Sequence, residues 1–197
     1  MNKVNSMRRE ISESLRQSAR IKEAIAKSKV NEIESMAKSI ISSYQEGGKV
    51  VLFGNGGSAA DAQHIACELV GRFAIKRQPF PAIALTTNTS TLTAIANDYG
   101  YEAVFTRQVE ALVSERDVVI GISTSGNSPN VVEAMKAAKG KGAKTIALTG
   151  GDGGKLAELA DLVLTVPSDV TPRIQEAHIT IGHILCELVE KELAKRE

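Results

Sequence analysis

The sequence predicts an α/β fold built on a five-stranded parallel sheet, with a helical extension at the N-terminus. Two observations predict it. Five short, almost entirely apolar runs alternate with segments of helical periodicity, which is typical of parallel strands covered by helices on both faces. The chain has 197 residues, of which 43% are hydrophobic and 24% charged, so it can bury a sizeable core and is not disordered as a whole.

The N-terminal extension comprises residues 1–46. This stretch contains no Pro or Gly, and its apolar residues recur at helical spacing between Ile11 and Ile41. Gly47-Gly48 is a typical C-terminal helix cap. We expect one or two amphipathic helices, which either pack on the domain or form an oligomer interface, because a long apolar stripe outside the sheet needs a partner. We therefore divide the chain into interface helices at 1–46 and a second domain at 47–197.

The sheet is assigned from the five apolar runs. The expected strands are residues 49–53, 82–85, 117–122, 145–148 and 162–166. Helical periodicity predicts helices at about 58–73, 130–141 and 173–195. Strands that alternate with helices in this way predict a doubly wound sheet with flavodoxin-like strand order.

The composition excludes several kinds of partner. With 24 Lys and Arg against 23 Asp and Glu, the net charge of +1 provides no basic face for nucleic acid or anionic lipid. Aromatic residues make up 4%, too few for a platform that stacks single-stranded bases. The two cysteines, Cys67 and Cys186, are expected to be reduced core thiols. Neither a membrane-spanning run nor a secretory signal is recognisable, so we expect a cytoplasmic protein with no nucleic-acid or membrane partner.

Two loops at the predicted carboxyl ends of strands are rich in glycine and small polar residues. The first is Gly54-Asn55-Gly56-Gly57-Ser58 and the second is Ser123-Thr124-Ser125-Gly126-Asn127-Ser128. Ligands of open α/β sheets bind at these strand ends, where glycine lets the backbone approach and a helix N-terminus favours an anion. Each loop alone is explained by ordinary turns and helix caps. The two together favour a ligand that carries a phosphate.

The first loop does not match the common nucleotide-binding motifs. It lacks the G-x-x-x-x-G-K-[ST] spacing and its lysine, which disfavours hydrolysis of nucleoside triphosphates. It also lacks G-x-G-x-x-G, because Ala59 stands where the third glycine would be, so a dinucleotide site is weakly supported.

The three histidines fall on two of the predicted helices. His64 and Glu68 are four residues apart and share a helix face, where they could hold a metal or move a proton, although an isolated pair of this kind is more often a surface pair. Helical spacing puts Glu176 and His183 on one stripe of the last helix, so periodicity alone favours Glu176 as the partner of His183. A metal or acid/base site joining the two helices is one interpretation of these residues. On the last helix, the polar residues that could contribute to such a site are Gln175, Glu176, His178 and His183.

Taken together, these residues resemble one known family. The resemblance is carried by Asn55-Gly56-Gly57-Ser58, His64-x-x-x-Glu68, Asn97-Asp98, the loop Ser123 to Ser128, and Arg173-Ile174-Gln175-Glu176 with His183. In this order and at these separations they are similar to the phosphoheptose isomerases of the sugar isomerase (SIS) superfamily, over nearly the whole chain. The resemblance implies that residues 47–197 form a flavodoxin-like SIS domain that binds a sugar phosphate, and that the protein is a homotetramer with active sites between subunits. The implied reaction interconverts sedoheptulose 7-phosphate and D-glycero-D-manno-heptose 7-phosphate, on the way to the heptose of lipopolysaccharide.

The same resemblance implies a role for individual residues. The implied ligands of one zinc ion per subunit are His64, Glu68, Gln175 and His183. The implied phosphate site is Ser123, Thr124, Ser125 and Ser128. The implied sugar contacts are Asn55, Gly56, Gly57, Ser58, Glu68, Asn97, Asp98 and Gln175. Glu68 and His183 are the implied acid/base pair, and their residue types suit an isomerisation that needs both a base and an acid. The family pattern thus favours Gln175 where helical spacing favours Glu176.

The chain departs from the family pattern at one position. Pro172 stands where some relatives carry an acidic residue, which puts a proton-relay role at that position in doubt, whereas proline suits the first turn of a helix.

Two other functions are compatible with parts of the sequence. One is a non-catalytic tetrameric SIS protein associated with the replication initiator, which the chain resembles in its glycine loop and in Ala94-Ile95-Ala96-Asn97-Asp98. That protein lacks residues matching Glu68 and His183, so the enzyme is favoured. The other is a different SIS sugar-phosphate isomerase or a sugar-phosphate sensor.

Overall fold

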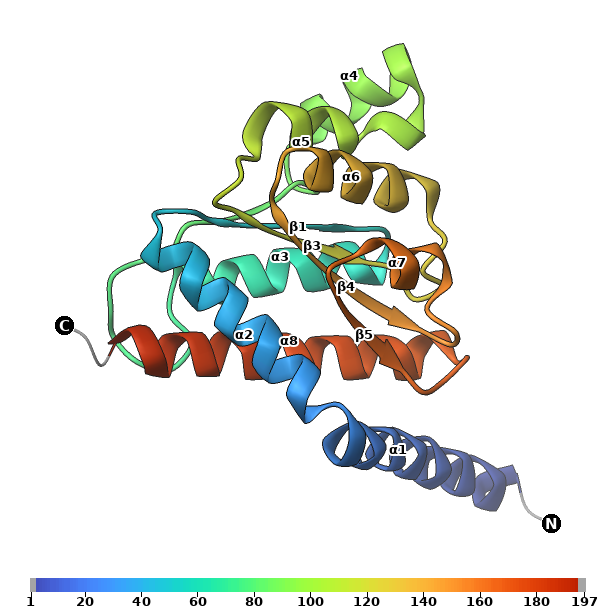
Figure 1. Ribbon diagram of the computed structural model, residues 1–197. Helices are drawn as coiled ribbons and strands as arrows, with labels where there is room; N and C mark the ends of the chain where they lie inside the picture. Colours follow the sequence, from blue (N-terminus) through green and yellow to red (C-terminus); the bar gives the residue numbers. More distant parts are fainter. Residues whose placement is uncertain (1–2, 195–197) are drawn as a thin grey trace.

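The computed structural model describes residues 3–194, in which five strands form a parallel sheet (Figure 1). The strands are β1 (Val50–Gly54), β2 (Ala82–Ala84), β3 (Val118–Ile122), β4 (Lys144–Gly150) and β5 (Leu162–Val166). They are ordered β2-β1-β3-β4-β5, and every neighbouring pair is parallel. This confirms the predicted fold class and the flavodoxin-like strand order.

Helices cover both faces of the sheet. They are α1 (Lys3–Ser28), α2 (Val30–Gln45), α3 (Gly57–Val70), α4 (Thr89–Tyr99), α5 (Thr106–Leu112), α6 (Pro129–Gly140), α7 (Gly154–Leu159) and α8 (Thr171–Leu193), with the 3-10 helix η1 at Tyr101–Ala103. Helical periodicity in the sequence predicts α3, α6, α8 and the N-terminal helices, but it gives no signal for α4, α5 and α7. Pro172 lies in the first turn of α8, as expected.

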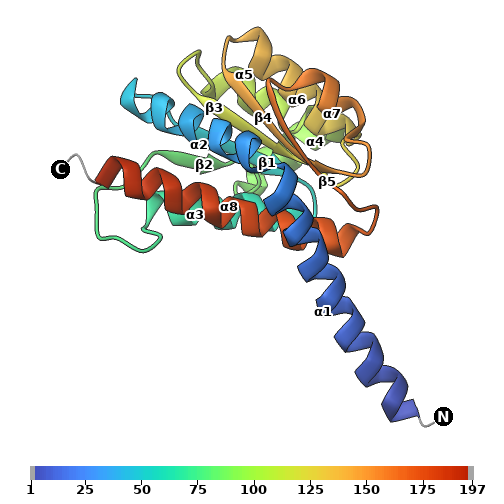
Figure 2. The same cartoon turned by 60° about the horizontal axis from the view of Figure 1, so that its bottom comes forward.

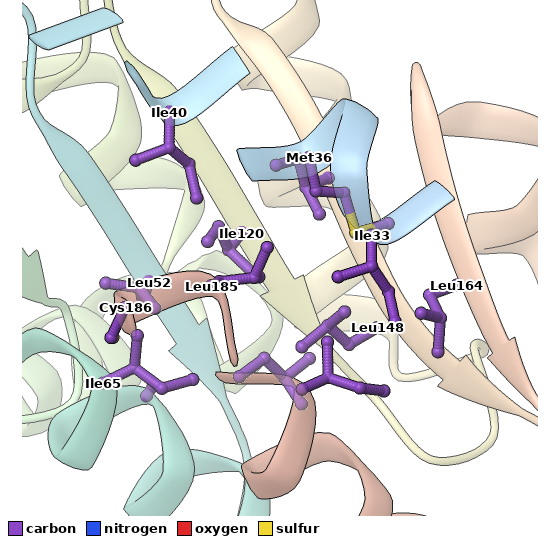
Figure 3. Packing of buried hydrophobic residues seen from close by; sticks show 14 of the residues in the cluster. Ile33, Met36, Ile40, Leu52, Ile65, Ile120, Leu148, Leu164, Leu185 and Cys186 are labelled. Atoms are coloured by element: carbon purple, nitrogen blue, oxygen red, sulfur yellow. The ribbon is translucent and has the colours of Figure 1, made fainter. Parts of the chain in front are cut away.

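Alternate side chains of each strand enter two different cores. Val50 and Leu52 of β1 pack with α1, α2, α3 and α8, whereas Val51 and Phe53 pack with α5, α6 and α7. Because both faces are buried, the strands are continuous apolar runs rather than alternating ones. Figure 3 shows the first core, in which Met36 of α2 lies among side chains that come from the strands and from α8.

The N-terminal segment forms two helices that separate at Lys29. At the end of α2, Gly48 N–H donates to the Ser43 carbonyl and Gly47 N–H to the Tyr44 carbonyl. Gly47 has φ of 75°, so this is the glycine cap that the sequence predicted. The end of α1 packs on the domain through buried residues, whereas its start extends away from the body (Figure 2). The apolar side chains along that start are exposed: Met7, Ile11 and Leu15.

The two cysteines have different surroundings. Cys186 is buried in the core, as expected, but Cys67 is exposed, so the prediction of a core thiol is wrong for Cys67. Among the helices described between residues 3 and 194, none combines the length and the apolar character that crossing a membrane requires.

Candidate active site

The two loops predicted to bind a ligand begin side by side. Gly54 at the end of β1 pairs with Ile122 at the end of β3, and the loops continue from there with Asn55 and Ser123. The Asn55 carboxamide exchanges two hydrogen bonds, each of 2.9 Å, with that of Asn130, which is buried at the start of α6. The first loop is therefore fixed to the helix that follows the second loop.

Two hydroxyl groups of the second loop, those of Ser123 and Ser128, lie together at the start of α6. Ser128 is the N-cap residue of α6, and its Oγ lies 3.0 Å from Oγ of the buried Ser123. A hollow of about 380 Å³ opens beside Thr124 and Ser125. Its lining contains no Lys or Arg and consists of Thr124, Ser125, Gly150, Gly151, Asp152, Asp169, Thr171 and Ile174. An anion here would be held by hydroxyl and amide dipoles, as the balanced composition predicts.

Gly126 and Asn127 fix this loop against the turn that follows β4. A Cβ on Gly126 would lie 2.5 Å from the Gly153 carbonyl carbon, so the two backbones pass too close together for any side chain at this position. The Asn127 side chain donates to the Ser125 carbonyl at 2.9 Å and accepts from Lys155 N–H at 3.1 Å. The loop is held in one conformation from both sides.

His64, Glu68 and His183 form one cluster across α3 and α8. His64 Nε2 lies 3.2 Å from Glu68 Oε1 and 3.2 Å from His183 Nε2. One ligand atom from each of the three residues lies within 4.8 Å of the others. In isolation, His64 and Glu68 looked like an ordinary surface pair. The fold adds His183, which lies 115 residues after Glu68 in the chain. Two imidazoles and a carboxylate in this arrangement suit both metal binding and proton transfer.

Gln175 and Glu176 point to different surroundings. A Cβ on Gly57 would lie 2.5 Å from Gln175 Nε2, so the glycine loop accommodates this side chain directly. Glu176 instead pairs with Arg173 at 2.9 Å and is absent from the cluster around His183. The choice of Glu176 from helical spacing is therefore wrong.

Asn97 and Asp98 bond to each other rather than to the other candidate residues. Both are exposed on α4, where Asn97 Nδ2 donates to Asp98 Oδ1 at 2.8 Å. Asp98 lines a separate hollow between α4, α5 and β2. Within the described part of the chain, no hydrogen bond joins these two residues to the loops or to the cluster.

Two further titratable groups lie near the cluster but have other surroundings. His178 is fully buried one turn from Gln175 and donates through Nε2 to the Thr149 carbonyl at 3.0 Å. Burial lowers the pKa of His178 to about 4, so this histidine is a neutral core residue. Burial raises the pKa of Asp61, one turn before His64, to about 6, although the nearby His64 acts in the opposite direction.

Several residues that shape the site are not predicted by any motif in the sequence. The Tyr101 hydroxyl donates to Asn55 Oδ1 at 3.2 Å, and the Phe73 ring lies 5.6 Å from the His183 ring. Arg77, in the segment that follows α3, forms a buried ion pair with Glu190 of α8. Periodicity carries no signal for these contacts, because each one joins positions at least 46 residues apart in the chain.

Comparisons with known proteins show which family the chain is similar to. The family model "SIS domain" matches residues 14–150. The phosphoheptose isomerase of Aquifex aeolicus is 58% identical over 181 residues, which are 92% of this chain and 95% of that protein. The structure of phosphoheptose isomerase GmhA from Neisseria gonorrhoeae has a TM-score of 0.89 at 44% identity, covering 94% of this chain and 99% of that one. A phosphoheptose isomerase structure from Francisella tularensis has a TM-score of 0.91 at 39% identity, covering 97% and 100%.

The sequence identity over nearly the whole chain and the similarity of the backbone fold confirm the resemblance that the motifs indicated. The chain belongs to the SIS domain family and, within it, to the phosphoheptose isomerases.

Proposed function

We propose that the protein is an aldose–ketose isomerase that interconverts sedoheptulose 7-phosphate and D-glycero-D-manno-heptose 7-phosphate, for the heptose of lipopolysaccharide. The observation that carries the proposal is the convergence of His183 of α8 with His64 and Glu68 of α3, the helix that follows the glycine loop. The relatives named phosphoheptose isomerase support the substrate. They give no support to the non-catalytic alternative, a binding protein associated with the replication initiator.

The substrate phosphate would bind at the second loop and the start of α6. The hydroxyls of Ser123, Thr124, Ser125 and Ser128 would donate hydrogen bonds to its oxygens. The sugar would extend from there toward the first loop, where the proposed contacts are Asn55, Gly56, Gly57, Ser58, Asn97, Asp98 and Gln175. Contact by Asn97 and Asp98 requires that α4 of the same or another subunit reach the sugar, which fits the proposal of sites between subunits.

Glu68 and His183 would move the protons. The Glu68 carboxylate removes the proton from C1 of the ketose while His183 gives a proton to the C2 carbonyl oxygen, which produces the enediol. The O1 hydroxyl then returns a proton to His183, and Glu68 returns its proton to C2, which produces the aldehyde at C1. The two transfers balance, because each residue ends in the protonation state in which it began.

The residues present fit a zinc ion. Two imidazole nitrogens and a carboxylate oxygen are ligand types that zinc takes, and the Gln175 amide would complete the proposed set of His64, Glu68, Gln175 and His183, with one ion per subunit. Bound zinc would supply polarisation of the substrate carbonyl or orientation of its hydroxyls. Glu68 and His183 belong to both the ligand set and the acid/base pair, so metal binding and proton transfer compete for the same atoms.

We also propose a cytoplasmic homotetramer in which residues 1–46 serve as interface helices for the domain at 47–197. The exposed apolar stripe at the start of α1 supports this, because such stripes are stable when a partner covers them. An apolar groove of about 390 Å³ between α1, α2 and α8 also supports a homotetramer with interface helices. Light scattering of the purified protein measures the oligomeric state, and a monomer would contradict this part of the proposal.

The function is tested by following purified protein with sedoheptulose 7-phosphate by NMR. We expect the signals of an aldose 7-phosphate to appear with turnover. Persistence of the ketose signals alone, at protein concentrations sufficient for single turnover, would contradict the proposed reaction.

A further inference from the structure

A buried ion pair outside the candidate site fixes the segment that follows α3. Residues 71–81 form neither helix nor strand before β2 begins. Glu190 of α8, with 1% of its side chain exposed, holds this segment, and its carboxylate accepts from Arg77 Nε at 3.0 Å. It also accepts hydrogen bonds of 2.9, 2.7 and 2.8 Å from the backbone N–H groups of Phe73, Ala74 and Ile75. A loop with no regular structure is thereby attached to α8 at four points.

Arg77 in turn binds the end of the helix that carries Glu68. Its Nη2 donates to the Glu68 carbonyl at 3.0 Å, and its Nη1 to the Leu69 carbonyl at 3.0 Å. Both carbonyls belong to the last turn of α3, where a helix lacks internal donors and where a positive charge is favourable. The backbone position of Glu68 is therefore determined partly by a guanidinium that Glu190 holds.

The same segment reaches His183. The Phe73 ring lies 5.6 Å from the His183 ring, with 47° between the ring planes. The N–H of Phe73 is one of the groups that Glu190 binds. The segment thus contacts one proposed proton-transfer residue through a backbone carbonyl and the other through an aromatic ring.

We propose that Glu190, Arg77 and Phe73 are positioning residues, which set the mutual placement of Glu68 and His183 by clamping residues 71–81 between α3 and α8. This inference rests on the proposed function, because it concerns the two residues assigned to proton transfer. Misplacement of reacting groups by about 1 Å is enough to lower a rate about a hundredfold. None of the three residues needs to touch the substrate for the clamp to act.

The chain contains a second buried carboxylate that serves as a control for the possibility that Glu190 only stabilises the fold. Asp117 is also buried, with 1% of its side chain exposed, and its carboxylate also accepts four hydrogen bonds, from Lys49 Nζ and N–H and from Ser114 Oγ and N–H. It lies just before β3, at the opposite end of the sheet from the candidate site. If such carboxylates only stabilise the fold, Glu190→Gln and Asp117→Asn should behave alike.

The first test compares kinetics per folded molecule. We expect both variants to lose stability in urea, but only Glu190→Gln to lose kcat, by about tenfold or more, with KM within about twofold of the wild type. Equal kcat values for the two variants would overturn the proposal. Phe73→Leu keeps the N–H that Glu190 binds and is compared with Ile75→Leu on the same segment. We expect a reduced kcat for Phe73→Leu alone, and equal kcat values would again overturn the clamp.

The second test does not depend on turnover. The chain has three histidines, so the ring signals of His183 can be distinguished by NMR from those of His64 and His178. We expect Glu190→Gln, which keeps the Phe73 ring and therefore removes no ring current from His183, to shift the His183 signals, whereas Asp117→Asn should leave them in place. Unchanged His183 signals would overturn the proposal even if the enzyme is active. Wild-type protein that shows no turnover, together with shifted His183 signals, would contradict the proposed function and support the clamp.

Discussion

Replacement of Gly126 by alanine tests whether the second loop must be held against the turn after β4 in order to bind phosphate. Gly126 has φ of 65°, where a side chain costs about 1–2 kcal/mol. The added Cβ would lie 2.5 Å from the Gly153 carbonyl carbon, whereas ordinary contacts begin at 3.4 Å. The Gly153 carbonyl oxygen would be closer still to the added Cβ than the carbon is, so the two loops would have to separate by about 1.5 Å to relieve the overlap.

This separation would break the hydrogen bonds that join the loops. Leu156 N–H donates to the Gly126 carbonyl at 3.1 Å, and Lys155 N–H to Asn127 Oδ1 at 3.1 Å. Each contributes about 1 kcal/mol, so with the backbone strain we expect Gly126→Ala to lower the free energy of unfolding by about 3–4 kcal/mol. Since Ser125 moves with the loop, we also expect KM for sedoheptulose 7-phosphate to rise at least about tenfold.

The matched control is Gly47→Ala. Gly47 also has a positive φ, of 75°, but a Cβ there would meet no atom within 4 Å. We expect it to cost only the strain of about 1–2 kcal/mol and to leave KM unchanged. Urea unfolding at one protein concentration and initial-rate kinetics measure both quantities. Equal losses of stability and equal KM values in the two variants would refute the reasoning about the loop.

Three further outcomes are expected. Ser125→Ala should raise KM by about tenfold or more, because a hydrogen bond to a charged group contributes about 1.5–3 kcal/mol, and an unchanged KM in initial-rate assays would remove Ser125 from the phosphate site. The pKa of His178 is about 4 in the folded protein and about 6.5 when unfolded, so the neutral ring contributes stability above pH 6.5 that is lost as the pH falls toward 4. The stability advantage of wild type over His178→Gln, measured by urea unfolding, should therefore shrink by about 3 kcal/mol between those pH values, and a constant difference would contradict the shifted pKa. Elemental analysis of protein purified without chelator should find zinc in the wild type and less in His64→Ala, and protein without zinc would remove the metal assignment.

The sheet could be predicted because its physical signal is local. Strands buried on both faces must be apolar throughout, and each of the five runs is visible without knowledge of its neighbours. The cap at Gly47 was predictable for the same reason, since a positive φ at the end of a helix favours glycine. α4 has no buried residue, and α5 and α7 span seven and six residues, so none of these helices produces a recognisable apolar stripe.

The candidate site was predictable in part. The composition of the two loops indicated an anion site, but the partner of His183 could not be chosen from helical spacing. A helical wheel shows which residues of α8 share a face. It does not show which of them faces the glycine loop, and that depends on how α8 packs against Gly57. The resemblance proposes Gln175 instead, a residue whose side chain lies against Gly57 of the glycine loop. The bond between Arg77 and Glu190 spans 113 residues, and only the folded arrangement reveals it.

The central claim is that Glu68 and His183, brought together from α3 and α8, carry out the isomerisation. Its most direct test is the single-turnover rate of aldose formation, followed by NMR, for Glu68→Gln and His183→Gln beside the surface control Glu133→Gln, which disturbs only an exposed pair with Lys136. We predict that the first two variants fold and form no detectable aldose while the control turns over like the wild type. A near wild-type rate in either Glu68→Gln or His183→Gln would contradict the assignment.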